Sequence, residues 1–288
     1  MTVALALALT LAAPPDNYNL RWKLKEGDTF YAQNKVVIDQ TFTAMGREVE
    51  QSITTEGVVR YKVTSVKPGT TVVEMTYLSN KTTAKGLPGA DAANDKLKGV
   101  TLTVTLDGKM EVAKLEGYDK IVDALAGGNE QAKAAVKGLL PEAVVRQGLN
   151  DMFALVPGDV VKIGGTWKRK DAIPLAGLGE VRTASTHKLD AVQGDTAKVN
   201  WTATGEFKNG DGTIPGLPVK LTKTDLKIEK LSGAYTFDLF TGRLKEAKTN
   251  MEMAGSLTFS ANGKEVSMDA KQKLNQTATL SDKNPLKE

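Results

Sequence analysis

The segment "LTVTLDGKMEVAK" at residues 102–114 returns, with one residue inserted, as "YTFDLFTGRLKEAK" at residues 235–248. In both segments apolar and polar residues alternate on either side of a short turn, which is typical of two antiparallel strands in a hairpin. In the first copy the turn holds Asp107-Gly108, a pair that tolerates the positive φ angles of a type I′ turn. The segment therefore predicts a β hairpin that turns at this dipeptide and is present twice in the chain.

Two further phrases recur in the same order. "GDTFYAQN" at 27–34 parallels "GGTWKRKD" at 164–171, and "YKVTSVKPGTTVVEMT" at 61–76 parallels "HKLDAVQGDTAKVNWT" at 187–202. A single match could arise by chance, because Thr- and Val-rich hairpins resemble one another in composition. Three matches in one order favour an internal duplication of an antiparallel β unit, whose strands are joined by loops too short for a parallel crossover.

The segment 118–155 has a different periodicity, with apolar residues three and four positions apart. This spacing is typical of amphipathic helices. Gly127-Gly128 is expected to end the first helix and Pro141 to open the last one, where a missing N–H costs nothing. We therefore expect a mainly β (α+β) fold, with two related antiparallel β units, as curved sheets or half-barrels, joined by a central helical segment.

These patterns divide the chain into a signal peptide at 1–13, a first β unit at 14–117, a helical connector at 118–155 and a second β unit at 156–288. Each unit alone would expose the apolar face of its sheet, which has to be covered by the other unit, the helices or a ligand. The pattern does not decide between one barrel and two sandwiches. The alternation predicts these core residues: Val63, Val73, Met75, Leu102, Val104, Val199, Trp201, Phe237 and Leu239.

The N-terminal run "VALALALTLAA" at residues 3–13 is apolar except for Thr10. Its length fits the apolar region of a secretory signal peptide and falls short of the roughly 20 residues of a membrane-spanning helix. The alternative is an apolar strand or helix that belongs to the fold. We expect export, to the periplasm or the outside of the cell, and a mature chain without a transmembrane segment.

The composition excludes several chemistries. The 288 residues include no cysteine and one histidine, His187, so disulfides, thiolate nucleophiles, Cys-ligated metals and sites with two imidazoles are ruled out. The 38 basic and 34 acidic residues, a net charge of +4, are interleaved along the chain. A nucleic-acid binder gathers Lys and Arg on one face, so we expect no nucleic-acid partner.

No motif indicates catalysis, a cofactor or a metal. His187 takes the place of Tyr61 in the duplicated strand, so we expect it to pack rather than to catalyse. There is no Gly-x-Ser-x-Gly elbow, "GLGE" at 177–180 lacks the third glycine of a dinucleotide site, and "KNGDGT" at 208–213 lacks the acidic ligands of a calcium loop. We predict that the protein is not an enzyme and has no catalytic, cofactor-binding or metal-binding residues.

Two loops, "KGLPGADAAND" at 85–95 and "GTIPGLPVKL" at 212–221, share a Gly-Leu-Pro element and fall between corresponding strands of the two copies. Both loops contain apolar residues outside the strand pattern. If the interior holds a cavity, these residues are the candidate ligand rim: Leu87, Pro88, Ile214, Leu217 and Pro218. The alternative is that both segments only connect strands.

Four phrases, "LRWKLKEGDTFYAQ" at 20–33, "TLTVTLDGKMEVAKLEG" at 101–117, "VKIGGTWKRK" at 161–170 and "SDKNPL" at 281–286, together resemble an uncharacterised family of exported planctomycete proteins. That family is a domain of unknown function, and the resemblance extends over nearly the whole mature chain. It implies bacterial export and a β-rich fold. It implies no catalytic residue.

Two functions fit these expectations best. The first is a non-enzymatic envelope protein, a structural or interaction module whose partner is unknown. The alternative is a periplasmic carrier that binds a lipid or other hydrophobic ligand between curved sheets and helices, an analogy made only at the level of the fold. A hydrolase is least favoured. A continuous aliphatic cavity of several hundred cubic ångströms would favour the carrier, and a filled core would favour the module.

Overall fold

The computed structural model describes residues 17–86, 95–175, 179–209, 212, 220–261 and 264–287. The first strands are β1 (Tyr18–Asn19), β2 (Thr29–Ala44), β3 (Arg47–Lys67), β4 (Thr70–Lys85), β5 (Thr101–Asp107) and β6 (Val112–Glu116). Three helices follow, α1 (Tyr118–Ala126), α2 (Glu130–Leu139) and α3 (Glu142–Phe153). The remaining strands are β7 (Val160–Val161), β8 (Thr166–Leu175), β9 (Gly179–Gln193), β10 (Thr196–Asn209), β11 (Lys220–Asp238), β12 (Arg243–Ala261) and β13 (Lys264–Ser281).

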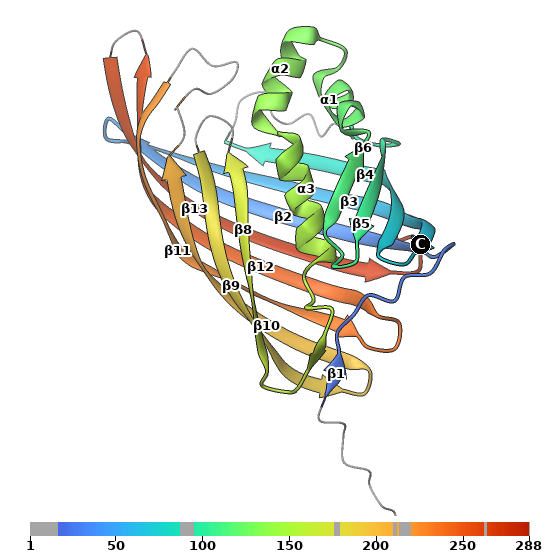
Figure 1. The fold of residues 1–288 in the computed structure, drawn as a ribbon. Coiled ribbons are helices and arrows are strands. Elements are labelled where there is room, and N and C mark those ends of the chain that lie inside the picture. Colours follow the sequence, from blue (N-terminus) through green and yellow to red (C-terminus); the bar gives the residue numbers. More distant parts are fainter. Residues whose placement is uncertain are drawn as a thin grey trace, which may run out of the picture.

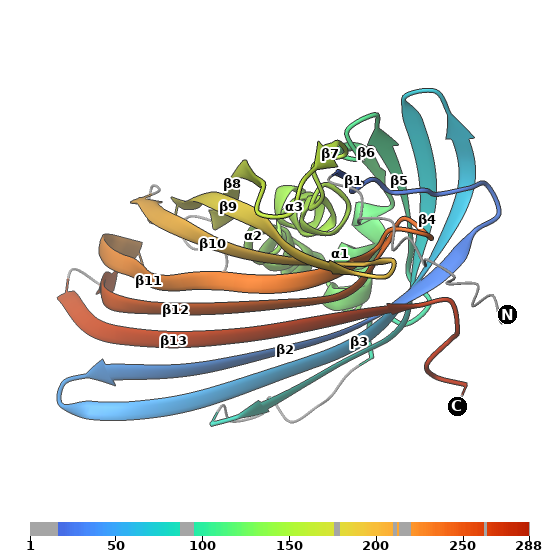
Figure 2. The same cartoon turned by 90° about the horizontal axis from the view of Figure 1, so that it is seen from below.

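All strands except β1 and β7 belong to one antiparallel sheet, in the order β6-β5-β4-β3-β2-β13-β12-β11-β10-β9-β8. The sheet curves around the helices, and its edge strands β6 and β8 do not pair with each other (Figures 1 and 2). The fold is mainly β, with two antiparallel units and helices between them in the sequence, as predicted. The units form neither a closed barrel nor two sandwiches, because they share one open sheet.

The strand pairing of the first unit repeats in the second. The strands β2 to β6 and the strands β8 to β12 each form a meander in which every strand pairs with the next one. The register repeats as well: Phe30 lies opposite Tyr61 between β2 and β3, and Trp167 lies opposite His187 between β8 and β9. These are the residues that the sequence comparison matched, so the first two repeated phrases occupy equivalent places.

Two of the β-bulges repeat too. The pairing of β3 with β4 skips Thr64, and the pairing of β9 with β10 skips Asp190 at the matching place. The pairing of β5 with β6 skips Ala113, and that of β11 with β12 skips Lys245. Bulges are local features that families of related structures keep. Their repetition within one chain therefore supports an origin of the two units by duplication.

The third repeated phrase is matched in the correct hairpins but two residues out of register. Leu102 lies opposite Met75, and the residue opposite the matching Trp201 is Gly233, not the Tyr235 that opens the second phrase. Alternating Thr, Val and Leu residues give the same apolar pattern after a shift by two positions, because side chains in a strand have a period of two. Composition alone could not separate the two alignments.

The hairpin of β5 and β6 is confirmed, whereas its predicted turn is wrong. Residues 108–111 connect the strands, and Met110, rather than Gly108, has a positive φ, of 65°. The Asp107 carboxylate explains the wider loop, because its Oδ1 accepts hydrogen bonds from two backbone N–H groups of the loop, each at 2.9 Å. An aspartate that binds nearby backbone amides in this way offers an alternative to the tight turn.

The helices begin and end close to the predicted residues. Gly127, with φ of 61°, ends α1 in the left-handed conformation that favours glycine. The Asn129 side chain caps α2 by accepting from the N–H groups of Gln131 and Ala132. Pro141 directly precedes α3.

The packed core lies toward the ends of the strands where β3 turns into β4 and β9 into β10. The ring of Trp22 lies 5.4 Å from that of Phe153 and 6.0 Å from that of Phe237, and Phe30 stacks on Tyr61 at 5.1 Å, so both units and α3 meet there. Two of the predicted core residues, Trp201 and Leu239, are only partly buried. The other predicted core residues are buried: Val63, Val73, Met75, Leu102, Val104, Val199 and Phe237.

The convex face of the sheet is polar. In β13, Lys271 and Lys273 are exposed on this face, whereas Ala270, Gln272 and Leu274 are more buried on the concave face. This alternation follows from the period of two in a strand. The apolar side of the sheet is therefore the inner side, which faces the helices and the space between the sheet and the helices.

Candidate ligand-binding cleft

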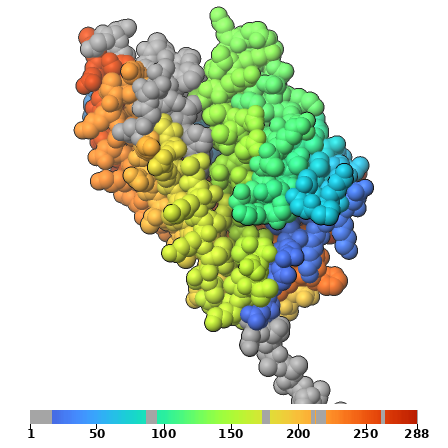
Figure 3. All heavy atoms as spheres, in the orientation of Figure 1, coloured from blue at the N-terminus to red at the C-terminus, as the bar shows by residue number. Residues whose placement is uncertain are grey.

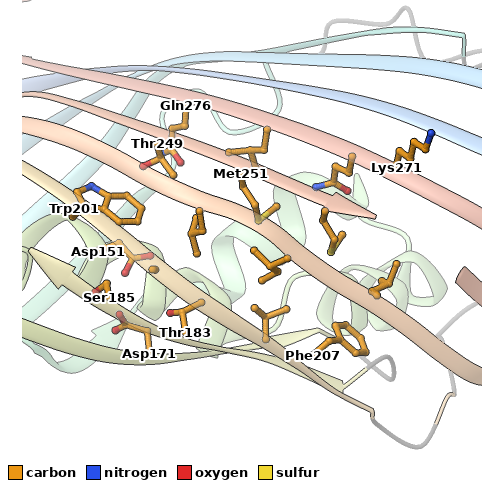
Figure 4. Close-up of a pocket in the computed structure, with 18 of the residues that line it drawn as sticks. Asp151, Asp171, Thr183, Ser185, Trp201, Phe207, Thr249, Met251, Lys271 and Gln276 are labelled. Carbon is orange, nitrogen blue, oxygen red and sulfur yellow. The ribbon is translucent and has the colours of Figure 1, made fainter. Parts of the chain in front are cut away.

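The concave face holds a cleft beyond the packed core. Parts of β2 and of β8 to β13, together with the end of α3, enclose a volume of about 610 Å³. The side chains that line the cleft project from these strands toward a common space (Figure 4). The volume falls within the range of roughly 300–1,000 Å³ that is common for ligand sites.

The walls of the cleft are mostly apolar. They follow from the strand alternation, as in β11, where the inward Leu226 and Ile228 flank the exposed Lys227. Aliphatic side chains outnumber aromatic ones, as expected for a chain with only 6% aromatic residues. The main apolar side chains of the wall are Phe42, Phe207, Leu226, Ile228, Met251 and Leu274.

One polar pair interrupts the apolar wall at the seam between the two units. Gln40 on β2 donates a hydrogen bond from Nε2 to Oε1 of Gln272 on β13, at 2.8 Å. Each amide satisfies part of the hydrogen-bonding capacity of the other. Contact of this pair with an apolar ligand therefore costs little free energy.

The polar end of the cleft, formed by Gln147, Asp151, Arg169 and Asp171, lies where α3 meets β8. The Arg169 guanidinium donates to Asp171 at 3.0 Å and contacts Asp151 at 3.5 Å. The Gln147 amide donates to both carboxylates, at 2.9 Å to Asp151 and 3.0 Å to Asp171. Figure 4 shows Asp151, Asp171 and Ser185 near one end of the cleft and Phe207 at the other.

The two carboxylates differ in exposure. Asp171 is 20% exposed and Asp151 is 52% exposed. Burial raises the pKa of Asp151 above its ordinary value, while the Arg169 charge opposes this change. Since half of the Asp151 side chain remains in contact with water, solvent screens the effect.

Ser185 and His187 line the cleft beside this polar end. They stand two positions apart on β9 and face inward, and Ser185 Oγ lies 3.0 Å from His187 Nε2. The imidazole is 2% exposed and stacks on Trp167 at 5.5 Å and on Trp201 at 5.8 Å. His187 therefore packs, as predicted from its match with Tyr61, and also forms part of the cleft wall.

The Ser185–His187 pair is poorly suited to nucleophilic catalysis. In a catalytic triad an acid accepts a hydrogen bond from the second imidazole nitrogen, but among the described residues His187 Nδ1 has no partner. Burial, with the nearby Arg169 charge, lowers the pKa of His187 to about 4, so the imidazole is a weak base. The pair is better suited to hydrogen bonding than to acyl transfer.

Helix α3 connects the two edge strands of the sheet, β6 and β8. On one side, Arg146 donates to the backbone oxygen of Val112 in β6 at 2.8 Å, and the Asn150 side chain accepts from the N–H of Val112 at 2.8 Å. On the other side, Gln147 and Asp151 contact Asp171 and Arg169 of β8. Figure 3 shows the green helical segment between the yellow strands of the second unit and the cyan strands of the first.

The rim residues predicted from the sequence, Leu87, Pro88, Ile214, Leu217 and Pro218, lie outside the described residues, as does the predicted signal peptide. The polar end was not predicted from the sequence. One signal for it was available: at inward positions where the first unit has the apolar Ala32 and Val59, the second has Arg169 and Ser185.

These features define a mainly β protein with an open, curved antiparallel sheet and an apolar cleft that is polar at one end. A family model matches residues 56–284, so the chain belongs to a family whose description is "Family of unknown function (DUF6263)". No curated protein sequence matches the chain.

Several solved structures are distantly similar. Lipovitellin matches 87% of this chain with 11% identity and a TM-score of 0.43, and the chain spans only 25% of the lipovitellin chain. The outer membrane protein OprG from Pseudomonas aeruginosa matches 89% of this chain and 97% of its own, with 7% identity and a TM-score of 0.20. The COG4313 outer membrane channel from Pseudomonas putida F1 matches 94% of this chain and 100% of its own, with 10% identity and a TM-score of 0.25.

The described residues contain neither a candidate membrane-spanning helix nor a candidate metal cluster. No described helix has the length and apolar character needed to cross a membrane. Within the same ranges, no three or more Asp, Glu, His or Cys side chains are grouped in a way that could hold a metal ion.

Proposed function

We propose that this protein is a non-enzymatic binding protein that carries a hydrophobic ligand, such as a lipid with an acyl chain, in the cleft of its concave face. The observation that carries the proposal is the cleft itself, a continuous space of about 610 Å³ with mostly aliphatic walls. A filled interior is what we expected for the first function considered from the sequence, a structural or interaction module.

Leaving the apolar surface of the cleft in contact with water costs free energy. Burying apolar surface contributes roughly 25 cal/mol for each Å² removed from water. In the cleft, side chains such as Ile228, Met251 and Leu274 are only partly buried by protein. An apolar ligand would supply the missing contacts, which is why the wall favours binding.

We further propose that the protein is exported, to the periplasm or outside the cell. The support is the apolar run at residues 3–13, whose length fits the apolar region of a secretory signal peptide. The measurement is N-terminal sequencing of the protein from the cells that make it. A mature form that still begins at Met1 would contradict export.

A second candidate function, an interaction module, is favoured by two exposed apolar side chains at hairpin turns. Met45, between β2 and β3, is 83% exposed, and Phe240, between β11 and β12, is 78% exposed. Single exposed apolar residues are common on protein surfaces, so this observation weighs less than the cleft. Replacing both with serine should leave ligand binding intact if the cleft is the site.

The test is to fill the cleft. Ala203 on β10 lines it, and the next residue, Thr204, is exposed on the convex face of the same strand. We expect the purified protein to enhance the fluorescence of N-phenyl-1-naphthylamine, an uncharged apolar dye. Ala203→Phe should weaken dye binding by about tenfold or more, because the new ring occupies the space.

Thr204→Phe is the matched control, since it adds a ring of similar size to the opposite face of β10. It should bind the dye as the unmodified protein does. The proposal fails if the unmodified protein does not bind the dye, or if both variants bind it equally well.

A further inference from the structure

We propose that the cleft selects amphiphiles whose head group donates hydrogen bonds and has no negative charge, such as an alkyl ammonium or a glycerol ester, over amphiphiles with an anionic head. This inference rests on the proposed function. It adds which end of the ligand the protein recognises, and by what chemistry.

The charges at the polar end carry the argument. Two carboxylates, Asp151 and Asp171, face a single guanidinium, Arg169, so the formal balance there is −1. Arg169 already contacts both carboxylates through the same Nη2, at 3.0 and 3.5 Å. Its positive charge is therefore shared between two carboxylates, and it is poorly placed to neutralise a third anion.

The neighbouring cations point elsewhere. Lys168 and Lys170 alternate with Arg169 along β8 and are exposed on the opposite face of the strand. Lys271 borders the cleft on β13, but its ammonium points away from the labelled polar residues (Figure 4). An anionic head at the polar end would thus meet two carboxylates, with no free cation beside them among the described residues.

The polar end offers acceptors to a donor head group. In each carboxylate the hydrogen bonds from described residues end on Oδ1, which leaves the Oδ2 atoms of Asp151 and Asp171 without a donor from that part of the chain. Both side chains line the cleft. A hydroxyl or ammonium group could donate to these oxygens, and charge-assisted hydrogen bonds of this kind are among the stronger ones.

A second and independent observation points to a polar ligand group at this place. His187 lines the cleft, is 2% exposed, and its Nδ1 is buried without a partner among the described residues. A buried polar atom without a hydrogen bond costs free energy. Next to it, the hydroxyl of Ser185 can rotate toward an incoming group.

The experiment is a displacement assay with three amphiphiles of equal chain length, each kept below its micelle concentration. Bound N-phenyl-1-naphthylamine is displaced by dodecylammonium, monododecanoylglycerol or dodecanoate. We expect the first two to displace the dye at concentrations about tenfold lower than dodecanoate, since an attractive replaces a repulsive interaction with the carboxylates. Equal or tighter binding of dodecanoate overturns the proposal.

Charge removal locates the source of the preference. Asp151→Asn brings the formal balance to zero and should reduce the preference for dodecylammonium to about threefold. Asp151→Asn with Asp171→Asn leaves the Arg169 charge alone and should abolish or reverse the preference. The control is Asp269→Asn, which removes one negative charge from an exposed position on β13 and should leave the preference unchanged. An undiminished preference in both cleft variants overturns the proposal.

Different results would contradict the proposed function and the head-group selection. Dye binding without any preference among the three amphiphiles contradicts only the head-group selection. Absence of dye binding to the unmodified protein contradicts the proposed function, and the head-group selection with it. Dye binding by the Asn variants also shows that their cleft is folded, so that their selectivity can be compared.

Discussion

Inward positions on β8 and β9 hold different side chains from their counterparts on β2 and β3. Ala32 and Val59 are almost completely buried in the core, whereas the equivalent Arg169 and Ser185 border the cleft. His187 likewise takes the position of Tyr61. Tyr61 is buried in the core, whereas His187 forms part of the cleft wall. Where the first unit packs side chains against one another, the second unit has a polar end that faces an open space.

A size exchange between neighbouring strands accompanies this difference. In the first unit Met75 lies opposite Leu102, and in the second Trp201 lies opposite Gly233. A Cβ atom at Gly233 would lie 2.7 Å from the Trp201 ring and 2.1 Å from the backbone oxygen of Lys248. The indole of Trp201 can therefore lie against β11 only because its partner has no side chain.

Gly233→Ala is expected to destabilise the protein by about 1–3 kcal/mol, because the added methyl group overlaps backbone and ring atoms. The measurement is the free energy of unfolding from urea denaturation. The control is Gly148→Ala in α3, where nothing lies within 4 Å of the new Cβ. That change should stabilise the helix by about 0.5–1 kcal/mol, so equal effects of the two substitutions would contradict the account.

His187 makes stability depend on pH in a predictable direction. Its pKa in the folded protein is about 4, below the ordinary value of 6.5, because burial disfavours the charged imidazole. As the pH falls below 6.5, the unfolded chain binds a proton before the folded one does. The contribution of His187 is therefore complete above pH 6.5 and is lost as the pH falls toward 4.

We expect the unmodified protein to lose about 2 kcal/mol more than His187→Phe between pH 8 and pH 5. Phenylalanine keeps the stacking with Trp167 and Trp201 but does not titrate. Urea denaturation at both pH values measures the difference, and the other titrating groups cancel in the comparison. Identical pH dependence in the two proteins would show that His187 is not buried as described.

Among the elements, α3 bridges the two edge strands of the sheet, β6 and β8. The four side chains that do this lie on two sides of the helix: Arg146 and Asn150 face β6, while Gln147 and Asp151 face β8. A helix that binds the free backbone groups of an edge strand also protects that strand from pairing with another chain. The same contacts place Asp151 at the polar end of the cleft.

Asn150→Ala should leave the buried N–H of Val112 without an acceptor and destabilise the protein by about 1–3 kcal/mol. Hydrogen exchange at the Val112 amide should become faster, while exchange in β12 stays unchanged. Asn250→Ala is the control, since Asn250 is exposed on the convex face of β12 and should change stability by no more than about 0.5 kcal/mol. Unchanged exchange at Val112 would contradict the bridging role of α3.

Local patterns predicted the elements better than their exact contacts. The hairpins and helices follow from alternation, from spacings of three and four, and from glycine at Gly127, because these signals act within a few residues. The turn after Asp107 was mispredicted because the hydrogen bonds of one carboxylate to the loop backbone decide it. The polar end was missed because α3 and β8 contribute to it from separate parts of the sequence.

At the scale of the whole molecule, β13 determines how the two units are arranged. It has no counterpart in the first unit, and it pairs with β12 on one side and with β2 on the other. This pairing joins the units into one sheet. The sequence could not indicate it, because a pairing between strands more than two hundred residues apart leaves no local signal.

The continuous sheet separates the interior into two regions. Near the turn at residues 67–70 the two units and α3 fill the space with aromatic and aliphatic side chains. Farther along the strands the helices no longer cover the sheet, and the cleft results. The duplicated apolar faces predicted from the sequence are thus covered in part by protein, and the proposed ligand covers the rest.

The most direct test of this account is native mass spectrometry of the protein purified from the cells that produce it. We predict a non-covalent adduct with the mass of an amphiphile, released on denaturation and absent from Ala203→Phe prepared in the same way. A mass equal to that of the polypeptide alone, in protein shown to be folded, would contradict the claim that the cleft holds a hydrophobic ligand.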